Sequence, residues 1–407
     1  MELMGYQAFR QKSRAINSYL LISLIFFIPI STSLSSVFAI LIFLFWILSI
    51  DLDELREQLR NPLIIAVLAY VSLFAIGLLW TDDLAWGLHQ TEKQWKLLLL
   101  LPLMSTVVRV HYRYYLASYL TSMLFSAILS FLLWLEIINF EGVSPKYPIP
   151  FNTHISYNPL LALALYFIFH IILFRFRELS PRRLLLMITS AVVMTGSMFI
   201  TTGRTGQLAF FVLLVILILQ YFRRRITWGL VITSILIPLL ILAAYQFGPG
   251  FKMRVDTGIR SFEGFRSKPE TSIAQRLTFA INSLELATDN FILGVGTGDF
   301  PSEYKKINEI NSPAFMVTDD PHNHYLLVLT QFGIIGFLVF LSIFVVQIKM
   351  AWLSEDSLKD YRYALPVFYL TIMTSGTYLL GQELSLCFAV SSAILYSKKT
   401  PSARPAN

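Results

Sequence analysis

One short turn combines residue types that can hold an anion. Residues 201–206 read TTGRTG, so that Arg204 lies between Gly203 and Gly206, which allow a tight backbone. A guanidinium presents a planar fork of donors that fits the oxygens of a phosphate. The alternative is an arginine that extends from the end of an apolar helix toward water. We interpret Arg204 as an anion ligand.

A second stretch, residues 319–324, holds the residue best suited to accept a proton, His322. We expect Asp320 to cap the following helix, Pro321 to take its first position and His322 to lie in its first turn. The positive helix end favours a neutral imidazole there, whereas the neighbouring aspartates favour the charged form. Either a purely structural role or a role as base is compatible with this pattern.

A metal site in the same stretch is disfavoured. His322 and His324 are two residues apart and would therefore face different sides of a helix. The sequence contains no HExxH-type pair. A single cysteine, Cys387, excludes both a disulfide framework and a cysteine-based zinc site. We expect neither a metal nor another cofactor.

A third arginine, Arg276, lies in a predicted helix over 271–289, beside an apolar stripe at helical spacing. Glycines 294, 296 and 298 follow, and we interpret them as a tight turn because no strand precedes them. Upstream arginines are weaker candidates for substrate contact, since nearby acidic residues would also suit a solvated charged face; they are Arg254, Arg260 and Arg266.

The elements that must position these residues are membrane-spanning helices. Of 407 residues, 56% are hydrophobic and 14% charged, against roughly 25% charged in soluble domains. A span needs roughly 20 apolar residues. The sequence therefore predicts one all-α polytopic membrane domain over 1–407. About twelve spans are expected, near 16–31, 33–50, 62–80, 94–109, 114–138, 157–175, 183–200, 206–222, 226–246, 323–349, 362–380 and 383–397.

The basic residues predict the orientation. The net charge of +7 comes largely from lysines and arginines in short loops, which is typical of membrane orientation and not of nucleic-acid binding. Arg10, Lys12 and Arg14 place the N-terminus inside, and twelve spans place both termini in the cytoplasm. The long, partly helical loop 247–322 then lies outside, and all three candidate stretches gather on that face. Lys93 and His154 are further outer-face candidates for substrate contact.

Several motifs together resemble a known family. Residues 321–326, PHNHYL, are continued by QFGIIG at 331–336; TGRTG precedes them, and Arg276 is followed by LGVGTG at 293–298. Their order around one large outer loop is similar to that of the O-antigen ligase and polymerase superfamily. In this resemblance Arg204, Arg276 and His322 match essential residues, and Lys93 matches a basic position loosely. The family often differs at Gly203 or His324, which leaves the role of His324 open.

The resemblance implies a GT-C-like, metal-independent, inverting glycosyltransferase of the bacterial inner membrane. It would move a glycan from undecaprenyl diphosphate to lipid A–core oligosaccharide at the periplasmic face. Arg204 and Arg276 would compensate the leaving diphosphate and His322 would act as base. Asn323, His324, Lys93 and His154, together with the three upstream arginines, are the candidate substrate contacts. Membrane lipids are the expected surroundings.

Three other functions use a similar pattern. An O-antigen polymerase and a pilin O-oligosaccharyltransferase would share the loop and differ in acceptor. A lipid or polysaccharide transporter would suit twelve spans, but such proteins often show related halves and polar residues at the midplane. No half-to-half similarity is evident, and the polar candidates gather on one face. We therefore expect an O-antigen ligase.

Overall fold

Apolar runs form helices throughout the structure, a computed structural model that describes residues 2–263 and 271–397. The described residues contain no β-strand. The helices up to the long loop are α1 (Glu2–Phe27), α2 (Thr32–Leu48), α3 (Leu52–Leu59), α4 (Pro62–Ile76), α5 (Leu84–Glu92), α6 (Trp95–Leu98), α7 (Leu100–Thr106), α8 (Tyr112–Trp134), α9 (His154–Arg175), α10 (Pro181–Ile200), α11 (Arg204–Tyr221) and α12 (Ile226–Phe247). The later ones are α13 (Pro249–Glu263), α14 (Ser272–Asp289), α15 (Phe300–Asn311), α16 (His324–Trp352), α17 (Lys359–Ile372) and α18 (Gln382–Tyr396). Short 3₁₀ turns are η1 (Gly77–Trp80), η2 (Arg109–His111), η3 (Phe176–Glu178) and η4 (Met373–Ser375).

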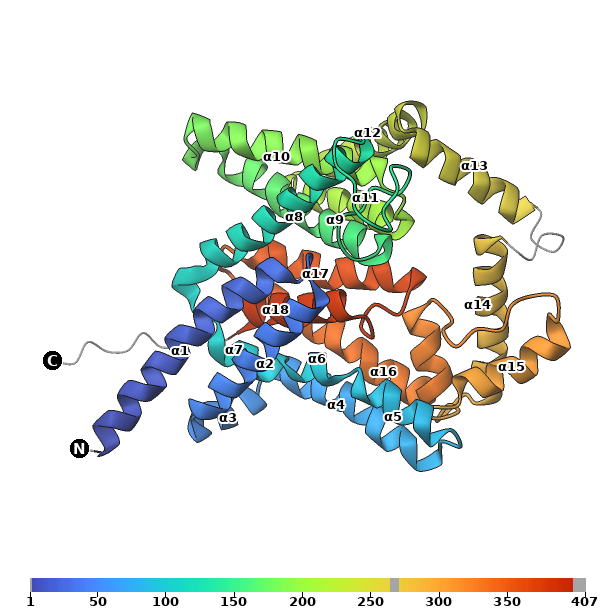
Figure 1. Cartoon of the computed structure of the whole chain (residues 1–407), viewed down its shortest axis with the longest axis horizontal. Coiled ribbons are helices and arrows are strands. Elements are labelled where there is room, and N and C mark those ends of the chain that lie inside the picture. The colour runs from blue at the N-terminus through green and yellow to red at the C-terminus, as the bar shows by residue number, and fades with distance from the viewer. Residues whose placement is uncertain (1, 264–270, 398–407) are drawn as a thin grey trace.

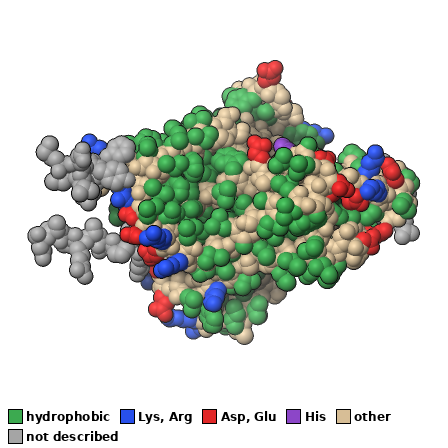
Figure 2. Space-filling view, turned by 90° about the horizontal axis from the view of Figure 1, so that it is seen from below, with side chains coloured by type: hydrophobic (Ala, Val, Ile, Leu, Met, Phe, Trp, Pro, Cys, Tyr) green, Lys and Arg blue, Asp and Glu red, His purple; other side chains and the backbone are tan. Residues whose placement is uncertain are grey.

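Seven of the described helices are long and apolar enough to cross a membrane, or up to eight if the pair α2 and α3, bent by 120°, counts as one span. In Figure 2, apolar side chains cover the middle of the visible face and charged ones gather toward its ends. The fold is thus an all-α polytopic membrane protein, as predicted. Each of the twelve predicted spans overlaps a helix, although 114–138 and 362–380 extend past the helix ends at Trp134 and Ser375, and the number twelve stays a prediction.

Two predicted spans are not the continuous helices that we expected. The stretch 94–109 is divided at Leu99 into the short helices α6 and α7. Helix α16 is interrupted at Gly333, whose φ of 60° and ψ of −162° are not helical. The break frees the carbonyl groups of Thr330 and Gln331 to accept hydrogen bonds from the loop, at 2.9 and 3.0 Å from the amides of Val295 and Gly296.

Helix α9 lies at the centre of one half of the bundle and is held closely against α11. Asn158 of α9 is fully buried; its amide donates to Gly203 O at 3.3 Å and its Oδ1 accepts from Thr201 Oγ1 at 2.8 Å. A β-carbon added to Gly206 would lie 2.2 Å from the carbonyl carbon of Asn158, and one at Gly203 would lie 2.6 Å from its side chain. The two glycines are therefore needed for the close approach of the turn to α9.

The long loop is folded and fixed at one end of the bundle, where α14 and α15 lie in Figure 1. The predicted helix at 271–289 is confirmed as α14, with Thr271 as its N-cap. Helix α15 is an element that the sequence did not predict, since its polar sequence FPSEYKKINEIN has only a narrow apolar stripe. Phe279 and Leu286 of α14 pack with Phe300 and Tyr304 of α15.

A buried carboxylate joins this loop to the start of α5. Asp299 is 4% exposed, and its side-chain oxygens accept hydrogen bonds from the amides of Asp82 at 2.9 Å and Asp83 at 2.8 Å. Close by, Thr297 Oγ1 donates to Phe74 O at 2.8 Å. The glycine-rich segment before Asp299 is a tight turn, as expected, with φ values of 69° at Gly294 and 102° at Gly296.

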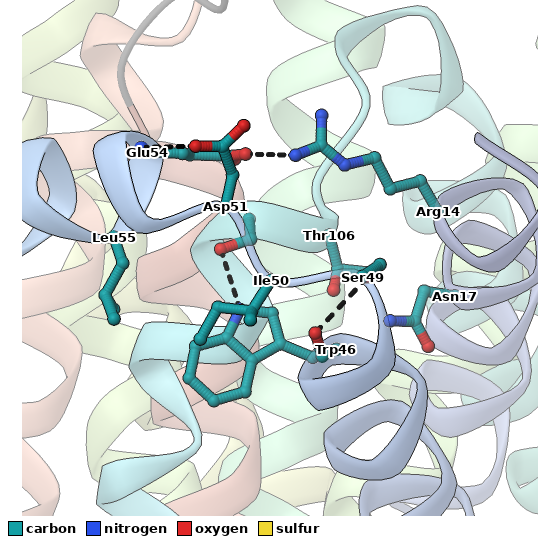
Figure 3. Close-up of a pocket in the computed structure, with 10 residues that line it drawn as sticks. Arg14, Asn17, Trp46, Ser49, Ile50, Asp51, Glu54, Leu55 and Thr106 are labelled. Carbon is teal, nitrogen blue, oxygen red and sulfur yellow. Dashed lines mark hydrogen bonds and ion pairs between the residues drawn. The ribbon is translucent and has the colours of Figure 1, made fainter. Parts of the chain in front are cut away.

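At the opposite end of the bundle, ion pairs join α1 to the start of α3. Figure 3 shows Arg14 directed at Glu54, and Trp46 Nε1 donates to Ser105 Oγ at 3.1 Å. Arg10 pairs with Asp51 at 2.7 Å. The space enclosed there is about 10 Å³, which is no larger than a single water site. This end of the bundle is a packed junction and not a substrate site.

We expect Gly206→Ala to destabilise the protein, because its methyl group would overlap backbone atoms of Asn158 that cannot move aside. Overpacking of this kind typically costs about 1–3 kcal/mol. Thermal unfolding of the detergent-solubilised protein should show a lower melting temperature. Gly381→Ala is the control, since the nearest atom to its added carbon is 3.5 Å away. Equal melting temperatures for the two variants would contradict the packing argument.

Candidate functional site

A cavity of about 730 Å³ opens at the same end of the bundle as the long loop. Its walls come from α5, the residues around the start of α9, the first turn of α11, α14, the segment before α16 and the segment that leads into α18. Five predicted site residues, far apart in the sequence, line it together: Lys93, His154, Arg204, Arg276 and His322. Asp319, Asp320 and Glu383 are the acidic residues of the lining.

The two arginines are brought together by α14. Arg204 is the first residue of α11, and its Nη2 donates to Ser272 Oγ at 3.4 Å. Ser272 begins α14, and Arg276 follows four residues later on the same face of that helix. The contact between the turn and the helix start therefore places both guanidiniums at one cavity.

A third cation, Lys93, ends α5 on another wall of the cavity. Its Nζ lies 5.7 Å from the centre of the Trp86 ring, within the range of a cation–π contact. In the part of the chain that the structure describes, neither Lys93 nor Arg276 forms an ion pair with a carboxylate. Positive charge in a partly enclosed site without a paired carboxylate favours an anionic ligand.

His322 is held by its own backbone and by Asp320. The residue has a φ of 51°, a left-handed conformation that is uncommon outside glycine. Its amide donates to Asp320 Oδ1 at 2.8 Å, and its Nδ1 lies 4.0 Å from Asp320 Oδ2. That second oxygen also accepts from Thr377 Oγ1 at 2.6 Å. The imidazole, 43% exposed, is 5.9 Å from the Phe279 ring.

The expected cap of the following helix was wrong. Asn323, not Asp320, is the N-cap of α16, because its Oδ1 accepts from the amides of Tyr325 at 3.0 Å and Leu326 at 3.2 Å. Asp320 instead uses its carboxylate on His322 and Thr377. His322 consequently precedes the helix, and the argument from the first helical turn does not apply to it.

Several predicted substrate contacts lie elsewhere. His324 is fully buried, with Nε2 2.8 Å from the hydroxyl of Tyr70, so it packs between helices and does not line the cavity. Asn323 caps α16 and donates to Thr374 O at 3.2 Å. Arg260 is exposed on α13, outside the cavity lining. Arg266 lies outside the described residues, as does the side chain of Arg254.

The sequence analysis missed the segment before α18. Residues 375–381 and the start of α18 supply much of one wall, including Ser375, Thr377, Tyr378 and Glu383. Glu383 accepts from Ser156 Oγ at 3.0 Å and so joins this wall to α9. The sequence does contain a signal for this wall, namely a polar stretch with Gly376 and Gly381 between two apolar runs. We assigned that stretch to the ends of the two last predicted spans.

The side chains present can bind an anion and accept a proton. No group of three or more His, Cys, Asp or Glu residues within the described ranges is arranged to hold a metal ion. Two polar atoms of the lining residues, Thr202 Oγ1 and Gln90 Oε1, are buried without a hydrogen-bond partner in the described structure.

Comparisons with known proteins agree with the motifs. A family model described as O-antigen ligase matches residues 189–341, a range that includes Arg204, Arg276 and His322. A comparison with curated proteins gave no match. The match over residues 189–341 supports a relationship to the O-antigen ligase superfamily, whose members are membrane glycosyltransferase-like enzymes.

Proposed function

We propose that this protein is an O-antigen ligase, which transfers a glycan from undecaprenyl diphosphate to lipid A–core oligosaccharide at the periplasmic face of the inner membrane. The observation that carries the proposal is the convergence of Arg204, Arg276 and Lys93 with His322 on one cavity. The family match supports the same class of reaction. Helices α5 and α14, which supply residues to the cavity, lie at the end of the bundle opposite to the N-terminus in Figure 1, which supports a periplasmic site if the N-terminus is cytoplasmic.

The cations suit the leaving group. A lipid diphosphate departs with negative charge that must be compensated where water is scarce, and guanidiniums do this with preorganised donors. The oxygens of the diphosphate would lie against Arg204 and Arg276, and Lys93, which lines the same cavity, would add a point charge. The undecaprenyl chain would extend into the surrounding lipid.

His322 suits the acceptor. As the acceptor hydroxyl attacks the anomeric carbon, its proton passes to the imidazole, the side chain that most often acts as a general base. The new C–O bond forms while the bond to the diphosphate breaks, and attack in line with the leaving group inverts the anomeric centre. Asp320, 4.0 Å from Nδ1 and fixed by Thr377, would stabilise the imidazolium and keep Nε2 toward the substrate.

Arg204→Ala, Arg276→Ala and His322→Ala should each lower glycan transfer by about 10²–10³-fold, the usual effect of losing one preorganised group. Transfer from lipid-linked glycan to lipid A–core is measured in reconstituted proteoliposomes by gel mobility. Arg224→Ala, an exposed arginine at the other end of the bundle, is the matched control and should retain full activity. Full activity in any two of the three site variants would remove this mechanism.

Asp320→Asn and Thr377→Val should lower kcat by about tenfold or more, because orientation and charge stabilisation of the base are lost while the cations remain. The KM for the lipid-linked donor should change little. Steady-state kinetics separate the two parameters. A rise in donor KM at constant kcat would instead assign Asp320 to donor binding.

Transfer should be unchanged by a chelator such as EDTA, since charge compensation is assigned to Arg204, Arg276 and Lys93. The assay compares rates before and after dialysis against chelator, with and without added Mg²⁺ or Mn²⁺. A strong loss that a divalent ion restores would contradict the metal-independent mechanism.

Transfer to pilin, or extension of the lipid-linked glycan itself, without transfer to lipid A–core would contradict the proposed acceptor.

A further inference from the structure

His322 lines both the cavity and a second, neighbouring groove. The cavity described above is lined by the three cations. The second, more open groove of about 660 Å³ adjoins it at His322 and is formed by α15 and the segment 316–319. Asp319 and His322 line both the cavity and the groove, and the remaining groove residues are Pro301, Ser302, Lys305, Met316, Val317 and Thr318.

The groove is built on a packed support. Tyr304 of α15 is fully buried against Phe279 of α14. Asn308 Nδ2 donates to Phe315 O at 3.0 Å, and Asn282 Nδ2 donates to Ser312 Oγ at 2.8 Å. These bonds fix the segment before 316 to both helices, so the groove is preformed.

The groove surface suits an oligosaccharide. Met316 and Val317 are 56% and 42% exposed and offer apolar contacts, as does Pro301. Sugar rings present C–H faces to such side chains and hydroxyls to polar ones, and few well-placed polar groups suffice for orientation. Lys305, a largely exposed cation that pairs with Glu309 at 3.8 Å, is the basic residue of the groove, and Asp319 is its acidic residue.

In-line displacement decides which sugar occupies the groove. The base must act on the face of the anomeric carbon opposite to the leaving group, as in inverting glycoside hydrolysis. The cations that would hold the leaving diphosphate line the cavity and not the groove. An acceptor hydroxyl that comes from the groove would therefore reach His322 without passing the diphosphate site. We propose that the groove between α15 and residues 316–319 binds the acceptor oligosaccharide. This assignment rests on the proposed function of the cavity.

Two pairs of variants test the groove. Lys305→Glu reverses a charge in it, and Lys306→Glu makes the same change one residue away, outside the lining; each lysine is exposed and pairs with a glutamate. Val317→Trp fills the groove, and Ile310→Trp adds the same bulk at an exposed position of α15 outside it. The substrates are purified lipid A–core and lipid-diphosphate-linked glycan.

Lys305→Glu and Val317→Trp should raise the KM for lipid A–core by about tenfold or more, a loss of about 1.4 kcal/mol, and leave the donor KM unchanged. The two controls should leave both constants unchanged. Equal effects in variants and controls, or no effect in either, would overturn the assignment. A rise in donor KM alone would also overturn it, because the groove would then hold the donor glycan.

A binding measurement separates this inference from the proposed function. Delipidated core oligosaccharide should bind the wild-type protein in saturation-transfer NMR, and Val317→Trp should weaken the signal whereas Ile310→Trp should not. Groove-dependent binding without any glycan transfer would count against the proposed function and support the groove. Transfer with binding that is insensitive to Val317→Trp would count against the groove alone.

Discussion

The close contact between the turn 201–206 and α9 is the constraint on which the site depends. Asn158 accepts from Thr201 and donates to Gly203, and the absence of side chains at Gly203 and Gly206 brings the two helices together. Arg204 follows directly and begins α11, so its guanidinium is fixed at the end of a buried helix pair. A cation in a partly desolvated place interacts with an anion more strongly than one in water.

The long loop contributes the other half of the site because it is anchored at several points. Asp299 receives two backbone amides at the start of α5, and Thr297 bonds to α4. These contacts hold α14 and α15, and through Ser272 they align Arg276 with Arg204. A loop that lies outside the spans thus carries one of the proposed catalytic cations and also one wall of the proposed acceptor groove.

Much of this arrangement could be predicted from residue types. Apolar runs of span length predicted the membrane helices, and Thr271 with the apolar stripe after it predicted α14. The residue types at Arg204, Arg276 and His322 predicted side chains that line one cavity. Tertiary contacts decided the remainder. Asp320 did not cap α16 because Thr377, 57 residues away, competes for its carboxylate. His324 is adjacent in sequence to the site yet faces Tyr70, since the left-handed residue before Asn323 redirects the chain.

The break of α16 at Gly333 restricts the length of the loop segment that packs against it, residues 291–299. The amides of Val295, Gly296 and Ile334 exchange hydrogen bonds with carbonyls across the break, and added β-carbons at Gly294 or Gly333 would lie 2.3 Å from the opposing backbone. An inserted or deleted residue between 291 and 299 would shift this register and leave polar backbone unpaired beside a membrane helix. Relatives of this protein should therefore keep the length of that segment constant and accommodate insertions elsewhere in the loop.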